Sequence, residues 1–129
     1  PERDPRTLAT AIRIGNPVSW KRALASLAAT GGVAAQGSDD EILEAKAVVD
    51  AAGMGCEPAS AASVAGARRL VQEGVIDRAA DVVCVLTGHV LKDPEATVSY
   101  HTAQPRRSRA NPPLAVAATA EAIRAALGE

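Results

Sequence analysis

Apolar and polar positions recur along the chain at helical spacing in three separate stretches. In the first, Asn16 is suited to the N-cap and Pro17 to the first helical position, where its missing N–H does no harm. Gly31 and Gly32 stop the pattern. We therefore expect an amphipathic helix that begins at Pro17 and ends at Gly31. Its apolar side chains form one stripe: Trp20, Ala23, Leu24, Leu27 and Ala28.

Two further helices are predicted by their end signals. Ser38 and Glu41 form a capping box, in which each side chain accepts a hydrogen bond from the other residue's backbone N–H. The helix that follows should end at Gly53. A third helix is expected over 59–73, with Gly74 closing it. The inward positions of the second helix are Ile42, Ala45, Val49 and Ala52, and those of the third are Ala61, Val64, Ala67 and Val71.

Between the helices lie short stretches with the composition of strands. The clearest is 81–86 (DVVCVL), which is β-branched and continuously apolar, as in a parallel sheet that is covered on both faces. Residues 7–14 suit a short buried strand or a lining segment, and 33–36 a brief strand. Alternating strands and helices favour an α/β fold, namely part of a doubly wound, mostly parallel sheet flanked by helices.

The pattern changes after Pro94. Residues 95–113 have no apolar period, and we expect an irregular arm whose arginines are solvated or pair with acids of a partner chain. These arginines are Arg106, Arg107 and Arg109. We expect a final short helix over 119–127. The predicted organisation is 1–94 as the α/β part, 95–113 as the arm and 114–129 as a C-terminal tail.

Composition narrows the class of protein. The net charge is −1 and aromatic residues make up 2% of the chain, which argues against a nucleic-acid partner. No stretch of 18 apolar residues predicts a membrane span, and the first residues lack the order of a signal peptide, so we expect a cytoplasmic protein. Cys56 and Cys84 are too few for a disulfide scaffold and lack partners for a metal site, so we expect reduced thiols.

Candidate chemistry lies where the expected strands end, because ligands of open α/β sheets bind there. Thr87 supplies a neutral hydroxyl that can donate to a ring nitrogen, and Glu57 can accept from a hydroxyl or an amine. Each also has an ordinary structural explanation, as a turn and a helix cap respectively. His89 is explained as a loop residue and Lys92 as a solvated one. Spacing alone therefore predicts an α/β segment with a small-molecule site.

Four segments, in order, carry a family resemblance. They are ATAIRIGNPVSW (9–20), SDDEILEAKAVV (38–49), CEPASAASVAG (56–66) and VVCVLTGHVLKDP (82–94). Together they resemble the C-terminal portion of the threonine synthase family, which belongs to the pyridoxal-phosphate enzymes with the tryptophan synthase β-subunit fold (fold type II). The resemblance implies that this chain is the distal part of the large domain of such an enzyme.

The resemblance also implies a reaction and its partners. The family converts O-phospho-L-homoserine and water to L-threonine and phosphate in threonine biosynthesis, with pyridoxal 5′-phosphate as cofactor, and is commonly dimeric. Its Schiff-base lysine and phosphate loop lie upstream of the matched region. None of the lysines singled out here falls on that position, so we expect no catalytic residue in this chain and no activity without the N-terminal half. Those lysines are Lys21, Lys46 and Lys92.

The family pattern assigns four cofactor-binding residues. Thr87 matches the residue whose hydroxyl bonds the pyridine nitrogen, and Ala11 matches the small residue packed on the face of the ring. Glu57 matches the acid of the EPASAA motif near the cofactor edge, and Gly88 keeps the backbone close to the ring. Val90 departs from the pattern, since many relatives have glycine there. The change leaves the Thr87 hydroxyl untouched.

Two alternatives stay open at this stage. One is a threonine or serine dehydratase, or another β-replacement enzyme of the same fold, although ATAIRIGNP (9–17) favours the synthase. The other is a non-catalytic binding or assembly remnant. In every case, part of a doubly wound domain should expose unpaired strand edges and an apolar face, so we expect the isolated chain to associate with itself or with the missing half.

Overall fold

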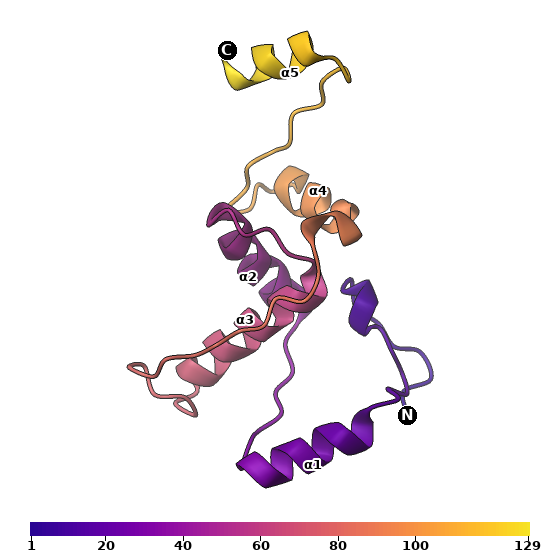
Figure 1. Cartoon of the computed structure of the whole chain (residues 1–129), viewed down its shortest axis with the longest axis vertical. Helices are drawn as coiled ribbons and strands as arrows, with labels where there is room; N and C mark the ends of the chain where they lie inside the picture. Colours follow the sequence, from indigo (N-terminus) through magenta and orange to yellow (C-terminus); the bar gives the residue numbers. More distant parts are fainter.

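Helices are the only regular elements of this chain. The computed structural model describes residues 1–129 and places the helices α2, α3 and α4 at its centre, with α1 and α5 set apart at opposite ends (Figure 1). The α-helices are α1 (Trp20–Thr30), α2 (Asp39–Ala51), α3 (Pro58–Gln72), α4 (Pro94–Thr102) and α5 (Ala120–Leu127), and the 3-10 helices are η1 (Thr10–Ile12) and η2 (Val90–Lys92).

The first predicted helix is present but starts later than expected. Helix α1 begins at Trp20 with Ser19 at the N-cap position, so the prediction that Asn16 caps it was wrong. Its end is as predicted, because Gly31 adopts the left-handed conformation (φ 62°) that a glycine reaches without strain. The apolar stripe of α1 is not buried: Trp20 is 47% exposed and Leu24 57%.

The capping box of α2 is confirmed. The Ser38 hydroxyl oxygen accepts from the Glu41 backbone N–H (3.2 Å), and Glu41 Oε2 accepts from the Ser38 backbone N–H (2.7 Å). The hydrogen bond from the Ser38 backbone is the main reason that the pKa of Glu41 lies below its ordinary value. Because the first turn of α2 also carries Asp39 and Asp40, negative charge collects at the positive end of the helix dipole.

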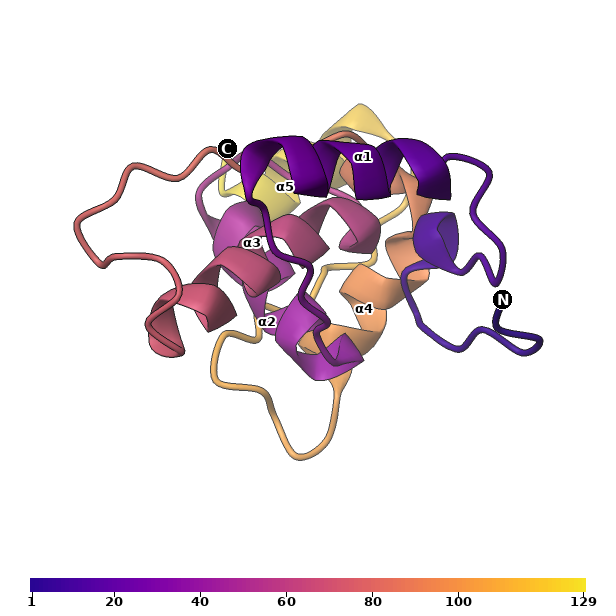
Figure 2. The same cartoon turned by 90° about the horizontal axis from the view of Figure 1, so that it is seen from below.

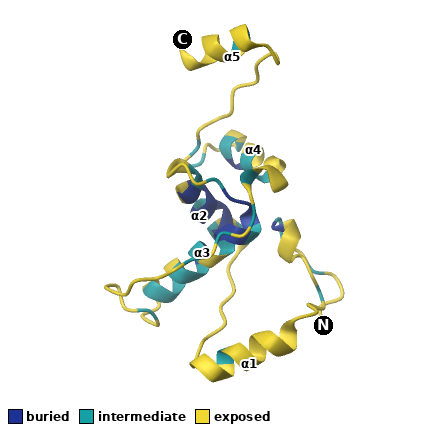
Figure 3. Cartoon of the chain, in the orientation of Figure 1, coloured by how far each residue is buried: buried dark blue, intermediate teal, exposed yellow.

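The largest buried cluster lies between α2 and α3. Helix α3 starts with Pro58 at its first position, directly after the extended Glu57, and packs along α2 (Figures 1 and 2). The side chains of this cluster are mostly small: Ile42, Ala45, Val49, Cys56, Ala61 and Ala65. A second cluster joins α4 to another face of α2 through Leu43, Ala47 and Tyr100. Figure 3 shows that burial is concentrated around these three helices.

A buried ion pair ties the end of α2 to the segment before α3. Lys46 Nζ donates to Asp50 Oδ2 (2.6 Å) and to the carbonyl oxygen of Cys56 (2.7 Å). The Cys56 backbone N–H in turn donates to Asp50 Oδ1 (3.2 Å). Burial raises the pKa of the Cys56 thiol, which therefore stays protonated and acts as a core side chain.

The expected parallel sheet is not found in these residues. The only β-type pairing is a single antiparallel bridge between Cys56 and His89. Residues 81–86 form no strand, and Val83 is 89% exposed. The expected strands at 7–14 and 33–36 are also absent, the first being replaced in part by η1. A strand requires a neighbouring strand to satisfy its backbone groups, and none of the 129 residues supplies one beside 81–86.

The segment expected to be irregular contains a helix. Residues 94–102 form α4, and its Tyr100 is buried. Arg107 pairs with acids of its own chain rather than of a partner, donating to Asp40 Oδ1 (2.7 Å) and lying 3.8 Å from Glu44 Oε1. Its guanidinium also stands over the Tyr100 ring at 5.5 Å from the centroid. The helical pattern was missed because Pro94 was taken as a boundary rather than as a first helical residue.

The final helix is present as predicted. Thr119 caps α5, its hydroxyl accepting from the Ala122 backbone N–H (3.2 Å), and Gly128 ends it in the left-handed conformation. No helix of the structure has both the length and the apolar character needed to cross a membrane.

Candidate functional site

Three of the four predicted site residues meet at the N-terminal end of α3. The backbone N–H of Glu57 donates to the carbonyl oxygen of Gly88 (3.0 Å), next to the bridge between Cys56 and His89. A Cβ atom on residue 88 would overlap the Glu57 carboxylate. Gly88 is therefore required by the close approach of the two segments rather than by its backbone angles. Thr87 precedes it and is exposed.

Ser60 joins these residues and was not singled out from the sequence. It lies in the first turn of α3 and is 2% exposed. Its hydroxyl oxygen accepts from the backbone N–H groups of Thr87 (2.9 Å) and Gly88 (2.9 Å) and lies 3.2 Å from Thr87 Oγ1. The available signal was a serine three residues after Glu57, at the start of a helix that follows an extended segment. A hydroxyl at that position can reach a neighbouring loop.

Glu57 contributes a buried carboxylate at the same place. The residue is 3% exposed, and its Oε2 atom receives no hydrogen bond. The nearest cation is Lys92 of η2, whose Nζ lies 3.5 Å from Glu57 Oε2 while its side chain remains 60% exposed. Lys92 was expected to be a solvated residue; its side chain is exposed as expected, and it is also the charge partner of Glu57. A buried carboxylate whose Oε2 atom receives no hydrogen bond is suited to accept one from a ligand.

Ala11 lies close in the fold but is not shown to join the other three. It belongs to η1, which contacts α3, and its side chain is exposed. Two tethers hold this region: the Thr10 hydroxyl donates to the Asp93 carboxylate (2.8 Å to the nearer oxygen), and the Thr7 hydroxyl donates to Asp39 Oδ1 (2.6 Å). These contacts place η1 beside the junction that carries η2 and α4.

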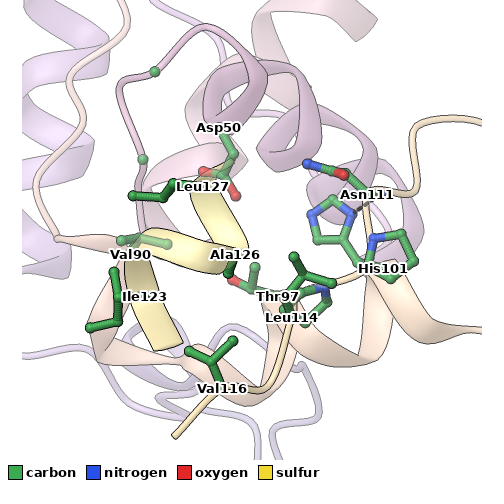
Figure 4. A pocket seen from close by; sticks show the side chains of 14 residues that line it. Asp50, Val90, Thr97, His101, Asn111, Leu114, Val116, Ile123, Ala126 and Leu127 are labelled. Carbon is green, nitrogen blue, oxygen red and sulfur yellow. Dashed lines mark hydrogen bonds between the residues drawn. The ribbon is translucent and has the colours of Figure 1, made fainter. Parts of the chain in front are cut away.

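The largest cavity of the structure lies elsewhere. It has a volume of about 660 Å³ and is lined by residues of α5 and the segment before it on one side and of α2, η2 and α4 on the other (Figure 4). Its lining is mainly apolar, with Val90, Leu114 and Ile123 among the side chains, and none of the four predicted site residues contributes to it. His101 at its rim accepts from the Asn111 backbone N–H (2.9 Å) through Nδ1. This cavity lies between the C-terminal tail and the helices.

The donor set at the start of α3 fits one edge of a flat heterocycle. An exposed neutral hydroxyl, a glycine without a side chain and a buried carboxylate with a free oxygen are suited to a ring nitrogen and a polar ring substituent. No group of three or more His, Cys, Asp or Glu side chains is arranged to hold a metal ion. The hydroxyl, the glycine and the carboxylate suit the ring edge of the expected cofactor, pyridoxal phosphate. They offer no site for its phosphate group.

Comparison with known proteins gives a consistent result. No protein-family profile matches the chain. Among curated proteins, it is 54% identical over 99 residues to the threonine synthase of Methanosarcina acetivorans, an alignment that covers 76% of this chain and 24% of the relative. It is 50% identical over 99 residues to the threonine synthase of Methanocaldococcus jannaschii, with the same coverage. It is 43% identical over 99 residues to that of Mycobacterium tuberculosis, covering 28% of the relative.

The alignments cover only part of each relative. This chain spans about a quarter of the length of the curated relatives that it matches. The predicted resemblance, made from four ordered motifs, is confirmed by these identities. Over the matched residues the chain is similar to the C-terminal portion of threonine synthases.

Proposed function

We propose that this chain is the C-terminal part of a threonine synthase, a pyridoxal-phosphate-dependent lyase that converts O-phospho-L-homoserine and water to L-threonine and phosphate. The identity of 54% to a threonine synthase over three quarters of the chain carries this proposal. No observation favours a dehydratase or a non-catalytic remnant. The contacts at the start of α3 support the proposal because they gather Glu57, Thr87 and Gly88 at one place.

The proposed role of this chain is to hold one edge of the cofactor. Pyridoxal phosphate supplies, when bound, a conjugated ring that spreads the negative charge developed on the substrate. Thr87 donates its hydroxyl to the ring nitrogen, Gly88 lets the backbone approach the ring, and Ala11 leaves room over its face. Glu57 orders the site, since its backbone N–H is bonded to Gly88 and its carboxylate is paired with Lys92. A carboxylate at this position would keep the ring nitrogen protonated. The neutral hydroxyl of Thr87 does not.

The Schiff-base lysine is proposed to come from the rest of the enzyme. Lys46 is buried and paired with Asp50, and Lys92 is paired with Glu57, so both ammonium groups have structural partners. These pairings support the proposal that neither Lys46 nor Lys92 is the Schiff-base lysine.

The rest of the enzyme is also proposed to complete the sheet. Residues 81–86 run extended with Val83 and Val85 exposed, as a strand does before its neighbours are added. We propose that they form an inner strand of the doubly wound domain, which includes residues 1–94 and carries α4 against α2, and that the rest of 95–113 and the tail lie outside it. The complete enzyme is proposed to be a cytoplasmic dimer, as is common in the family.

A chimera tests the proposed function. Residues 1–129 would replace the matching quarter of the Methanosarcina acetivorans threonine synthase, and phosphate release from O-phospho-L-homoserine would be measured. We expect activity that depends on pyridoxal phosphate, and we expect Thr87→Val to lower it by roughly tenfold or more through loss of one hydrogen bond. If the chimera folds and binds the cofactor but converts only free L-threonine, the proposed synthase activity is wrong and the chain belongs to a dehydratase.

A further inference from the structure

The apolar face of α5 is largely exposed. Ile123, Ala126 and Leu127 lie at positions i, i+3 and i+4 and therefore share one side of the helix. Ile123 is 48% exposed and Leu127 is 70% exposed. All three side chains nevertheless line the cavity of about 660 Å³ that Figure 4 shows. This face of α5 is therefore turned toward the rest of the chain without being packed against it.

A helix as short as α5 needs a packing partner. It has eight residues, and isolated helices shorter than about 12–15 residues are marginal in water. The caps at Thr119 and Gly128 favour the helix but do not replace packing, because most helical stability in proteins comes from burial of an amphipathic face. The exposed face of α5 therefore requires a surface to cover it.

The opposite wall of the cavity is suited to receive that face. Val90 of η2 supplies an apolar side chain, and Gly53 and Gly55, in the segment after α2, have no side chains to obstruct a helix. A Cβ atom at residue 55 would lie 3.5 Å from the Val90 side chain, so Val90 lies against this glycine. The wall therefore offers an apolar side chain next to bare backbone, which lets a helix approach closely.

A short tether connects α5 to this wall. The tail leaves the helices at Asn111, whose backbone N–H donates to His101 Nδ1 (2.9 Å), and both residues line the cavity. Only residues 112–119 separate this point from α5, and Leu114 and Val116 among them also line the cavity. A short tether gives α5 a higher effective concentration at the wall than a second copy has in solution. The occupant that fits is therefore the tail of the same chain.

We propose that α5 is a strap that closes onto this wall. Closure brings Ile123 and Leu127 against Val90 and removes apolar surface from water, which drives the packing. Because Val90 and Lys92 belong to the same 3-10 turn, the closed strap also restrains η2, whose Lys92 lies 3.5 Å from the Glu57 carboxylate. Closure requires neither cofactor nor substrate.

A disulfide trap tests the closure. Val90→Cys/Ile123→Cys would be oxidised in the chimera and in the 129-residue chain, both carrying Cys84→Ser to remove the partly exposed native thiol. A disulfide forms readily only when two Cα atoms come within about 4.4–6.8 Å, so its yield reports the approach of α5 to η2. We expect a disulfide within one chain in both proteins, identified by mapping the linked peptides. Leu91→Cys/Ile123→Cys is the matched control and should react roughly tenfold more slowly, because Leu91 is the next residue of η2 but does not line the cavity.

Hydrogen exchange measures the strap without new cysteines. In the chimera, we expect Leu127→Asp to lower the protection factor of the Lys92 amide roughly tenfold, because a carboxylate disfavours the apolar contact that holds η2. Ala125→Asp is the control, since Ala125 lies in the same last turn of α5 but does not line the cavity. It carries the same unfavourable charge at the end of the helix and should leave the Lys92 amide unchanged.

The outcomes separate the strap from the other occupants of the wall. A disulfide no faster than the control, or one that joins two chains, would overturn the closure of α5 onto its own chain. A disulfide that forms in the 129-residue chain but not in the chimera would assign the wall to the rest of the enzyme, and would overturn it as well. If the disulfide forms but Leu127→Asp leaves the Lys92 amide unchanged, the restraint of η2 is wrong. A chimera that lacks activity but forms the disulfide contradicts the proposed function and leaves the strap intact.

Discussion

At the scale of single residues, the environment of each polar side chain decides its chemistry. Glu57 and Thr87 were identified from their positions in a family pattern, but their partners were not. Ser60 and Lys92 became relevant only when the structure placed them within hydrogen-bonding or ionic distance of those two residues. A serine among the alanines of CEPASAASVAG carries no sequence signal of its direction, since side-chain direction depends on which segment packs against the helix.

Gly88 allows a direct test of the close approach to Glu57. Gly88→Ala places a methyl group where the buried Glu57 carboxylate lies, so the carboxylate or the loop must move. We expect local stability around α3 to fall by about 1–3 kcal/mol, as for other overpacked sites. The measurement is native-state hydrogen exchange of the α3 amides in the chimera. Gly66→Ala is the control, because its Cβ would meet open space, and a similar loss there would contradict the explanation.

The buried Lys46–Asp50 pair predicts a larger effect. Asp50→Ala leaves the Lys46 ammonium buried without its carboxylate partner and removes the acceptor of the Cys56 N–H. We expect a loss of about 3–5 kcal/mol, typical of a broken buried pair. Denaturant unfolding of the chimera followed by exchange at α2 measures it. Asp40→Ala removes an exposed partner of Arg107 and should cost less than about 1 kcal/mol. If Asp50→Ala and Asp40→Ala lost equal stability, the Lys46 ammonium would have to reach solvent once Asp50 is removed.

At the scale of elements, four of the five α-helices were predicted because most of their ends are marked locally, whereas α4 was missed and the start of α1 was misplaced. Ser38 with Glu41, Pro58, Gly31 and Thr119 all act within one turn of the helix they start or end. Strands lack such self-contained signals. The segment 81–86 has the composition of an inner strand, yet it remains unpaired because a strand is completed only by residues far away in the chain or outside it.

The cap of α2 gives a prediction at this scale. Ser38→Ala removes the acceptor of the Glu41 N–H and should destabilise α2 by about 1 kcal/mol. Because folding lowers the pKa of Glu41, its contribution is present above the pKa of the unfolded chain and is lost as pH falls through the lower, folded value. The protection factors of the α2 amides, which correct for the slower intrinsic exchange in acid, should therefore fall as pH is lowered. Glu41→Gln should weaken that dependence, and an unchanged acid dependence in that variant would assign it to another carboxyl group.

At the scale of the whole molecule, the chain buries too little to be self-sufficient. Only 14 of its 129 residues are buried, and large apolar side chains are exposed along α1 and along 82–85. Alanine supplies much of the apolar content and little buried area, so α2 and α3 form a thin core. The exposed residues agree with the proposal that the chain is one segment of a longer protein, since the relative from Methanosarcina acetivorans is about three times its length.

The exposed apolar residues predict the behaviour of the isolated chain. We expect the 129-residue polypeptide to associate in solution and to bind a dye that reports apolar surface, as measured by sedimentation and fluorescence. Val83→Lys/Val85→Lys should reduce the association, since both valines lie on the unpaired extended segment. Val75→Lys, at another exposed valine beyond α3, is the control. A parent chain that stays monomeric and binds no dye would contradict this account.

The amino-acid sequence by itself determined most helix ends, but not the start of α1 or the presence of α4, together with the family resemblance and the residue types of the candidate site. These depend on contacts within a few residues, or on motifs that stand in order along the chain. Tertiary structure alone decided that Ser60 binds the Thr87–Gly88 loop, that Lys92 faces Glu57, and that Arg107 pairs within its own chain. The physical reason is distance along the chain, because each of these pairs is separated by more than 20 residues and meets only when α2, α3 and α4 have packed.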